Sequence, residues 1–310
     1  MIKYINHMKT FLQSKLLQGI IVSNVIVLII IWLNNWLHSE KDGILVFSEF
    51  VILPFLMGVI SAWFWRNLNL KSKLLIWYSI LNGLLAILLS YIFLGEGTIC
   101  LIIVSPLIFA FVITGAFIGK TMFRKNNQTL NVSIVSILLV IFTVDSISDH
   151  HYRNMVSDEM IVKAAPEKIW KNVVAFEKIK QADTYWLFKA GMPSPMQTTV
   201  TAYKRGAGRK CIFSNGYVFD EKIVTFDVNK DLTFDITGQP KDPEIMGHID
   251  IERGQFLLKD NGDGTTTLVG NSWYSLKVFP VWYYNLWAES ITRNVHLRVM
   301  HHIKELSEKN

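Results

Sequence analysis

Five long apolar runs dominate the first half of the chain and limit what it can fold into. They are Leu17–Leu37, Ile44–Trp65, Leu74–Leu94, Thr98–Gly119 and Leu130–Ser148. A bilayer core about 30 Å thick is crossed by roughly 20 apolar residues of α-helix. Tryptophan and tyrosine residues gather near the ends of several runs, as in the interfacial belts of membrane proteins. We therefore predict a region of five transmembrane helices over residues 1–148, in preference to five buried helices of a soluble domain.

The cations of this half lie on alternate loops. The N-terminal tail and the loops after the second and fourth runs hold nine Lys and Arg, and the other two loops hold one. Cytoplasmic loops of membrane proteins are enriched in Lys and Arg. We therefore expect a multi-pass protein of the cell membrane with a cytoplasmic N-terminus, the lipid bilayer as a partner, and residues 149–310 outside the cytoplasm. The first run lacks a small-residue cleavage site, so we interpret it as a span and not as a signal peptide.

The positive charge of the chain does not indicate a nucleic-acid partner. The net charge is +6, and residues 1–148 hold ten Lys and Arg against five Asp and Glu. A nucleic-acid-binding protein carries its basic excess on a folded surface, whereas here the excess lies in short loops. We expect no nucleic acid among the partners.

No motif for a metal ion or a cofactor is present. Neither Cys-x-x-Cys nor His-Glu-x-x-His occurs, and the pairs His150-His151 and His301-His302 lack the i, i+4 spacing of helical ligands. The two cysteines, Cys100 and Cys211, lie in different halves. We expect neither a metal nor a cofactor.

Two carboxylates fall within apolar runs. A charged side chain inside a membrane is costly, so such residues are candidates for a functional role. Glu49 and Asp145 are candidates on this ground. Both lie close enough to the ends of their runs to reach the head-group layer, which favours anchoring or helix pairing over ion passage. Four further residues permit interhelical hydrogen bonds and kinks: Asn24, Asn82, Pro54 and Pro106.

The pattern changes at about residue 149 to that of an α+β domain. Met160–Ala164 alternates as a strand, and Pro166 begins the first of two short helices. Six more alternating runs follow, separated by turn sequences: Thr198–Lys204, Arg209–Ser214, Tyr217–Val228, Leu232–Thr237, Gly254–Lys259 and Thr265–Leu276. After Pro280 a long helix carries one apolar stripe: Trp287, Ile291, Val295, Val299, Ile303 and Leu306. The β-α-α-β6-α order predicts a curved antiparallel sheet around a long C-terminal helix.

Three segments of this half resemble a known superfamily. They read KAAPEKIWKNV, GAGRKCIFSNGYVFDEKIVTFD and TTTLVGNSWYSLKVFPVWYYNLWAESITRNVHLRVMHHIKEL. With the element order, they are similar to the START-like, polyketide-cyclase-like helix-grip superfamily (SRPBCC), over about Glu159–Leu306. The resemblance implies a cavity between sheet and helix that holds a lipid or another hydrophobic molecule. Some members are cyclases or dehydratases, and others are transfer or assembly factors.

Glu221 is the first candidate for chemistry. If Phe219 and Ile223 face the concave side of the sheet, a period of two places Glu221 there as well. A carboxyl group in an apolar cavity has a raised pKa and could act as an acid, a base or a ligand anchor. The alternatives are a bulge that turns it outward and a Lys or Arg neighbour that pairs with it.

The last helix offers His302 and Arg298, with His296 on the flank of its apolar stripe. Facing a cavity, these side chains would donate to a carboxylate or carbonyl of a ligand. Alternatively, the cations near the C-terminus serve only the helix dipole, and Arg298 extends past the edge of the sheet. Glu221 and His302 are the weak catalytic candidates. The full predicted ligand-binding set is Tyr217, Phe219, Glu221, Trp273, Trp287, Ile291, Arg298 and His302.

Three functions are compatible with these features. The first is a membrane-anchored protein that binds a lipid or another hydrophobic small molecule outside the cytoplasm. The second is an enzyme of the cyclase or dehydratase type, with Glu221 and a helix histidine as acid and base. The third is a structural or signalling membrane protein without a ligand. The sequence favours the first.

Overall fold

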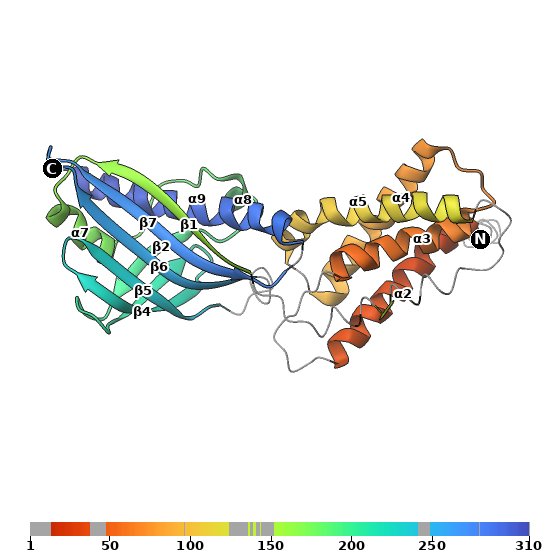
Figure 1. Ribbon diagram of the computed structural model, residues 1–310, viewed down its shortest axis with the longest axis horizontal. Coiled ribbons are helices and arrows are strands. Elements are labelled where there is room, and N and C mark those ends of the chain that lie inside the picture. The colour runs from red at the N-terminus through yellow and green to blue at the C-terminus, as the bar shows by residue number, and fades with distance from the viewer. Residues whose placement is uncertain are drawn as a thin grey trace, which may run out of the picture. The chain divides into compact units, whose positions relative to one another are not determined.

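The computed structural model describes residues 14–37, 48–95, 97–123, 152–240, 249–278 and 280–309, with four single positions between 136 and 143. The chain divides into two compact units, residues 1–149 and 150–310 (Figure 1). The expected fifth span lies almost wholly outside the described residues, and Asp145, His150 and His151 lie outside them too. The side chain of Glu49 is likewise not described.

The first unit is helical. Its elements are α2 (Lys15–Leu37), a π-helical turn (Ser48–Ile52), α3 (Leu53–Trp65), α4 (Ser72–Leu89), a second π-helical turn (Ser90–Leu94) and α5 (Thr98–Met122). Three stretches are long and apolar enough to cross a membrane: Lys15–Leu33, Ser72–Phe93 and Thr98–Met122. The apolar helix Phe50–Trp65 is shorter. Of the five expected spans, the described residues therefore support three at full length.

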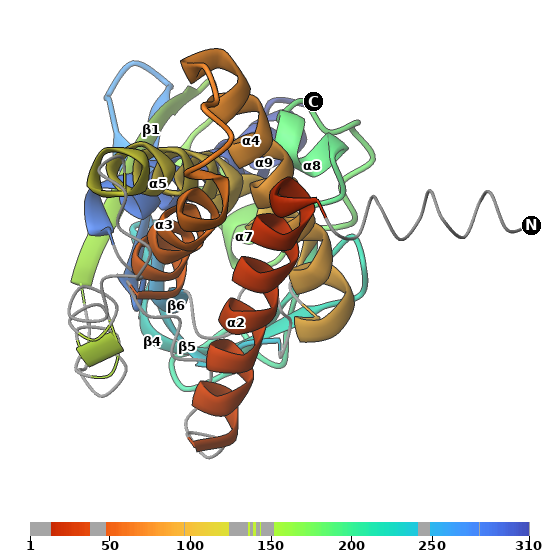
Figure 2. The same cartoon turned by 90° about the vertical axis from the view of Figure 1, so that its right-hand side faces the viewer.

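Helices α3 and α5 approach each other closely through small residues. A Cβ atom at Gly58 would collide with the Val112 carbonyl oxygen, and one at Gly115 would collide with the Phe55 carbonyl oxygen. One turn further along α5, Gly119 faces Ala62. Helix α3 also packs against α2, and α4 against α5 (Figure 2). Small residues four apart on both helices allow this backbone contact, as is typical of helix pairs in membranes.

A buried polar cluster joins α2, α3 and α4. The Asn24 amide donates to Asn82 Oδ1 at 2.6 Å, and the Asn82 amide donates to Ser61 Oγ at 2.9 Å and to Ser23 Oγ at 3.2 Å. All four side chains are buried. The expected hydrogen bonding of Asn24 and Asn82 between helices is confirmed. Large apolar side chains on the outer faces of these helices are exposed, among them Ile29, Trp77 and Leu88.

The second unit has the predicted element order. It runs β1 (Tyr152–Val162), α7 (Pro166–Val174), α8 (Trp186–Lys189), β2 (Pro195–Val200), β3 (Gly208–Phe213), β4 (Val218–Asp227), β5 (Asp231–Gly238), β6 (Ile249–Asp260), β7 (Thr266–Leu276) and α9 (Val281–Glu308). The strands form one antiparallel sheet in the order β1-β7-β6-β5-β4-β3-β2. The predicted curved sheet with a long C-terminal helix is confirmed. Strand β1 begins eight residues before the predicted Met160.

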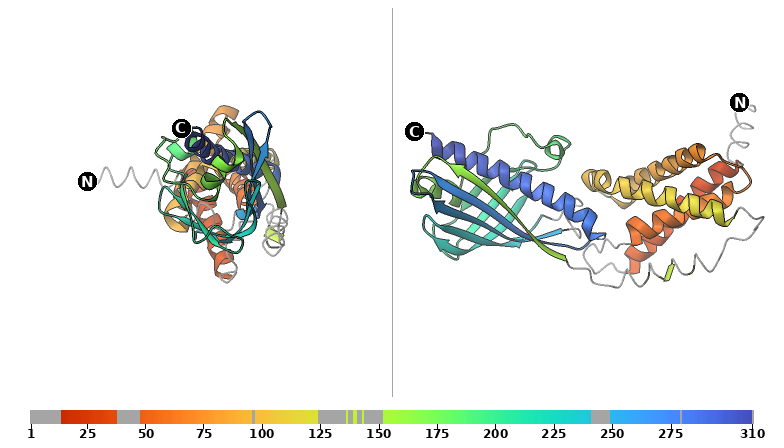
Figure 3. Two further views of the ribbon diagram at one scale, coloured as in Figure 1. Left: turned by 90° about the vertical axis from the view of Figure 1, so that its left-hand side faces the viewer. Right: turned by 45° about the horizontal axis from the view of Figure 1, so that its top comes forward.

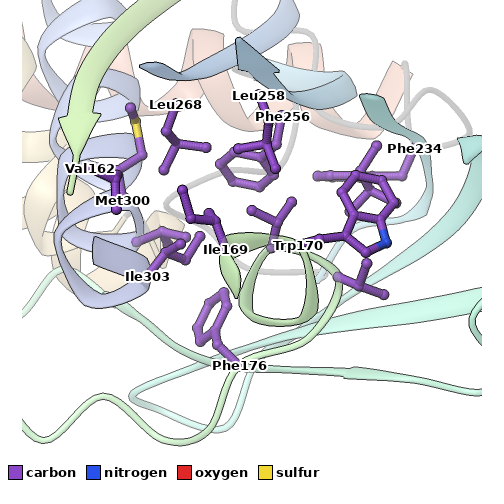
Figure 4. Close-up of a cluster of buried hydrophobic side chains, with 14 of the residues drawn as sticks. Val162, Ile169, Trp170, Phe176, Phe234, Phe256, Leu258, Leu268, Met300 and Ile303 are labelled. Carbon is purple, nitrogen blue, oxygen red and sulfur yellow. The ribbon is translucent and has the colours of Figure 1, made fainter. Parts of the chain in front are cut away.

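Helix α9 covers the concave face of this sheet (Figure 3). It packs on β1, β7 and the opposite edge strand β2, while α7 packs on β6 and on α9. Together α7 and the second half of α9 close one end of the half-barrel around a core (Figure 4). The labelled core side chains include Ile169, Trp170, Phe256, Leu268 and Met300. This end is solidly packed.

The predicted stripe on α9 is correct only for its second half. Val299 and Ile303 are buried, whereas Trp287, Ile291 and Val295 are only half-buried. In the first half the buried side chains are Tyr284, Ala288, Thr292 and His296. The helix is thus rotated by about one residue from the apolar stripe, because polar partners on β1 and β7 receive its first half.

Candidate functional site

The first half of α9 and the facing strands β1 and β7 form a polar region on the concave face. Side chains on that face come from alternate residues, so Asn154, Val156 and Asp158 of β1 lie beside Tyr274, Ser272 and Gly270 of β7. Helix α9 adds Asn285, Glu289, Thr292 and His296 to this region. Buried polar groups are costly unless they are hydrogen-bonded, so their partners define what the region can do.

His296 connects Asp158 to Ser272. Its Nδ1 lies 3.0 Å from Asp158 Oδ2, and its Nε2 lies 2.7 Å from Ser272 Oγ. His296 and Asp158 are buried, whereas Ser272 is partly exposed. Arg293 Nη1 adds an ion pair to Asp158 Oδ1 at 3.3 Å. The sequence predicts His296 on the flank of α9, and no motif in it indicates Asp158 or Ser272.

A second polar group lies at the start of α9. Tyr274 Oη donates to Asn285 Oδ1 at 2.9 Å, and the Asn154 amide donates to the same oxygen at 2.8 Å. The Asn285 amide donates to Glu289 Oε1 at 2.8 Å. Burial raises the pKa of the Tyr274 phenol to about 12, so it remains a neutral donor at physiological pH.

Glu221 lies on the concave face, as predicted, and is paired with Arg209. Its carboxylate accepts a hydrogen bond from Arg209 Nη1, and both side chains are almost fully buried. Arg209 Nε donates to the Val174 carbonyl at 3.0 Å, and the guanidinium lies 4.5 Å from the centre of the Phe234 ring. Burial raises the pKa of the Glu221 carboxyl, while Arg209 acts in the opposite direction. The pair therefore binds the C-terminal end of α7 to the sheet.

Cys211 lies two residues after Arg209, on the same face of β3. Burial, together with the charge of Glu221, raises the pKa of its thiol to about 12. Because the thiolate is the reactive form, this cysteine is inert at neutral pH.

His302 and Arg298 are bound to the segments that precede β2. His302 Nε2 donates to the Glu177 carbonyl at 3.0 Å, and its ring packs edge-on against Phe176. Burial lowers the pKa of His302. Arg298 forms an ion pair with Asp183 at 2.5 Å and donates from Nε to the Pro195 carbonyl at 3.0 Å. Both residues hold α9 to neighbouring segments, and no interaction in the described structure joins His302 to Glu221.

The remaining predicted ligand-binding residues are divided between the two faces of the sheet and α9. Phe219 is buried on the concave face beside Cys211, and its ring packs on Phe213 at 5.0 Å. Tyr217 precedes β4 and is half-buried. Trp273 pairs with Met155 and Arg253 and therefore lies on the convex face. The prediction that Trp273 lines a ligand site is therefore wrong. The alternation of β7 turns Tyr274, and not Trp273, toward the concave face.

Trp287 and Ile291 lie on the half-buried side of α9. The Trp287 ring packs against Trp186 at 6.2 Å and Tyr283 at 6.4 Å. Around this stack, Trp186, Trp282 and Leu286 are 50%, 67% and 63% exposed. The start of α9 thus presents an aromatic surface to the surroundings.

Several concave-face side chains away from the α7 end keep some accessibility. Ser272 on β7, Ile251 on β6 and Ile236 on β5 are all partly exposed, although each lies on the face that α9 covers. Helix α9 packs mainly on strands at the two sides of the sheet. These concave-face positions are therefore not fully covered by α9. Within the described residues, no group of three or more His, Cys, Asp or Glu could hold a metal ion.

No protein-family profile and no curated protein matches the chain. Among solved structures, a truncated norcoclaurine synthase from Thalictrum flavum is 11% identical, with a TM-score of 0.37, and the match covers 53% of this chain and 98% of that one. Protein MLL2253 from Mesorhizobium loti is 15% identical, with a TM-score of 0.32 and coverage of 49% and 96%. Ara h 8.0201 is 14% identical, with a TM-score of 0.32 and coverage of 49% and 98%. The strand order of the second unit and the placement of α9 on its concave face are those of a helix-grip fold.

Proposed function

We propose that this chain is a membrane-anchored binding protein. Its first unit would hold it in the bilayer, and its second unit would bind a hydrophobic or amphipathic small molecule, such as a lipid, between the concave face of the sheet and α9. The observation that carries the proposal is the contrast between the two ends of the half-barrel. One end is filled by α7 and its core, while the other keeps accessible side chains of both polar and apolar kinds.

The membrane anchor is supported by the distribution of polar groups in the first unit. Three helices are long and apolar enough to span a bilayer. Their polar side chains, Ser23, Asn24, Ser61 and Asn82, are turned inward and bound to one another. Lipid cannot satisfy polar groups, so inward hydrogen bonding and an apolar exterior are what a bilayer requires.

The proposed orientation follows from the cations. With a cytoplasmic N-terminus and five crossings, the second unit would lie outside the cytoplasm. A protease added to intact cells without an outer envelope should remove a tag placed after Asn310. Protection of that tag until detergent is added would overturn this orientation and leave the binding proposal to its own test.

The proposed site suits a molecule with an apolar body and a polar group. Ile236 and Ile251 offer apolar contacts on the concave face, and Ser272 of β7 and Thr292 of α9 add hydroxyl groups. Ligand sites commonly combine an apolar lining with a few polar groups that fix orientation. An apolar cavity close to a bilayer also shortens the path that such a molecule takes through water.

The experiment fills the space with a larger side chain. The full chain is purified in detergent and titrated with a fluorescent fatty-acid analogue, and its organic extract is analysed by mass spectrometry. Ile236 lies opposite Glu221 on the concave face of β5. Ile236→Trp should abolish saturable binding, because the larger ring would extend from this position into the proposed site. Thr237→Trp is the matched control, since residue 237 is exposed on the other face of the same strand.

Two results would contradict the proposal. The first is an absence of saturable binding together with an extract that holds no molecule beyond detergent and bulk lipid. The second is equal binding by both tryptophan variants. Either result would favour the alternative of a structural or signalling protein without a ligand. The alternative enzyme that uses Glu221 and His302 as a pair has no support in their hydrogen bonds, because each is committed to another partner.

A further inference from the structure

We propose that Ser272, His296 and Asp158 form a catalytic centre that cleaves a small carboxylic ester. The inference rests on the proposed function in one respect, since a substrate must reach Ser272 through the site proposed between the concave face of the sheet and α9. It goes beyond binding by assigning a covalent step to that site. This centre differs from the predicted pair of Glu221 and a helix histidine, because it does not use Glu221.

The three side chains come from three elements and meet in the order that a serine nucleophile requires. Ser272 Oγ lies 2.7 Å from His296 Nε2, and His296 Nδ1 lies 3.0 Å from Asp158 Oδ2. Such a nucleophile is recognised by this line of hydrogen bonds and by the role of each group, not by the order in sequence. The accessible member of the line is the serine, and the two buried members lie behind it.

A glycine of β7 lies directly beside the imidazole. Gly270 is the cross-strand partner of Asp158 and lies two residues before Ser272, on the same face of β7. A Cβ atom at Gly270 would lie 3.7 Å from His296 Cγ and 3.1 Å from Met300 Sδ. The tight contact would be with Met300, and the imidazole of His296 packs over this position at an ordinary van der Waals distance.

The charges fix the tautomer of His296. The Asp158 carboxylate, which also pairs with Arg293, can only accept a hydrogen bond. Nδ1 of His296 therefore carries the ring proton and donates a hydrogen bond to this carboxylate. Nε2 then has a free lone pair directed at the Ser272 hydroxyl. Asp158 acts as a positioning residue, because it holds the imidazole in this tautomer and stabilises the imidazolium that forms.

The reaction uses the ester and water only. Ser272 Oγ forms a bond to the acyl carbon as its proton passes to His296 Nε2, and the bond from acyl carbon to alkoxy oxygen breaks as that oxygen takes the proton and leaves as an alcohol. Water then adds to the acyl carbon and gives a proton to Nε2. The bond from Oγ to carbon breaks, Oγ recovers the proton, and a carboxylic acid is released.

The oxyanion must be stabilised by side chains. The backbone N–H groups of β7 lie in ladders with β1 and β6. Thr292 places a hydroxyl one turn before His296 on the buried face of α9, so it is the donor that the helix brings nearest.

The fold limits the size of the substrate. Toward the α7 end, Met300 and the core residue Leu268 close the space. In the other direction, β7 continues for four residues after Ser272 and ends at Leu276, which is about 14 Å of strand. We therefore expect a short-chain or aromatic acyl group to place its carbonyl carbon at Ser272 Oγ, whereas a long acyl chain would fill the same site without placing its carbonyl there.

The test uses the full chain in detergent with a fluorophosphonate probe, followed by peptide mass spectrometry, and with p-nitrophenyl butyrate and palmitate as substrates. Labelling should map to Ser272, and the butyrate ester should be cleaved at least about tenfold faster than the palmitate ester. Ser272→Ala should lose both labelling and cleavage. Ser275→Ala, a buried serine on the opposite face of the same strand, should keep both.

Positioning by Asp158 has its own readout. Asp158→Asn should lower the rate of labelling about 100-fold or more while leaving the labelled residue unchanged, and the pH profile of the remaining reaction should shift. Unfolding midpoints of all variants are compared to exclude loss of fold. A Ser272→Cys variant supplies a second nucleophile of similar size, whose alkylation by iodoacetamide should again require His296.

Absence of labelling at Ser272 in a folded chain that still binds the fatty-acid analogue would overturn the catalytic proposal and leave the proposed function intact. Labelling of Ser272 without saturable binding of the fatty-acid analogue would overturn the proposed function and support the catalytic proposal. Equal labelling of wild type and His296→Gln would also overturn the catalytic proposal, since the serine would then react without its base.

Discussion

Replacing Arg209 tests whether the buried pair with Glu221 is structural. In Arg209→Met the Glu221 carboxylate, 4% exposed in the folded chain, loses its cation, and the Val174 carbonyl loses its donor at 3.0 Å. Breaking a buried pair from one side costs about 3–5 kcal/mol, and an orphaned buried carbonyl costs about 1–3 kcal/mol. These costs are not additive, so we expect a loss of about 4 kcal/mol in the free energy of unfolding.

The double variant Arg209→Met/Glu221→Leu separates charge from packing. It removes both ions and leaves the Val174 carbonyl as the main unsatisfied group. We therefore expect it to be less stable than wild type by only about 1–3 kcal/mol. Lys210→Met is the matched control, because Lys210 pairs with Asp220 at 3.1 Å on the same two strands but in solvent. Exposed pairs contribute about 0–1 kcal/mol at most.

The pH dependence of Arg209→Met has a defined sign. Burial raises the pKa of Glu221 above its ordinary 4.5, and removal of Arg209 raises it further. The folded state then binds more protons than the unfolded state above about pH 4.5, so stability falls as the pH rises through the folded pKa, by up to about 1.4 kcal/mol per unit. The double variant lacks this slope.

Amide hydrogen exchange of the full chain in detergent, read by mass spectrometry on peptides that span β3–β5, measures these differences over a urea series. A single variant no less stable than Lys210→Met would refute the reasoning. So would a double variant as unstable as Arg209→Met, or a single variant whose stability rises with pH.

Three further results are expected. Gly115→Leu should lower the unfolding temperature of the full chain, because its Cβ atom meets the Phe55 carbonyl oxygen, while Ile118→Leu on the exposed face should not. Asn82→Leu should cost about 1 kcal/mol of the stability of the helical unit in detergent, measured by unfolding in dodecyl sulfate, since interhelical hydrogen bonds in membranes contribute about 0.6–2 kcal/mol. Tyr274→Phe should remove a phenol that ionises near pH 12 from the ultraviolet titration, and because that pKa is raised in the folded state, wild-type stability should fall above about pH 10.

The strands of the second unit could be predicted from sequence because their alternation is local. Each of the six runs from Thr198 to Leu276 overlaps one of the strands β2–β7. Strand β1 was predicted too short, since its first half holds Asn154 and Asp158 at inward positions. Polar inward residues break the apolar alternation, and their partners on α9 are about 130 residues away.

The same cause explains what was missed at the candidate site. A stripe of apolar residues predicted the buried face of α9, but its first half turns Thr292 and His296 inward. The available signal for Asp158 was its place in the alternation, two residues after Val156 and two before Met160. For Glu221 the sequence left open whether Lys or Arg would pair with it, and the cross-strand register of β3 and β4 supplies Arg209.

The cluster of Asn24, Ser61 and Asn82 also bears on how the proposed membrane protein is made. Synthesis delivers α2 and α3 before α4, so the first two helices enter the lipid without the amide that later bridges them. A nascent chain halted at that stage carries donors and acceptors that hydrocarbon cannot satisfy. In a bilayer, the arrival of Asn82 would therefore complete the polar links among α2, α3 and α4, and it would mark the stage at which the three helices hold together as one insertion product.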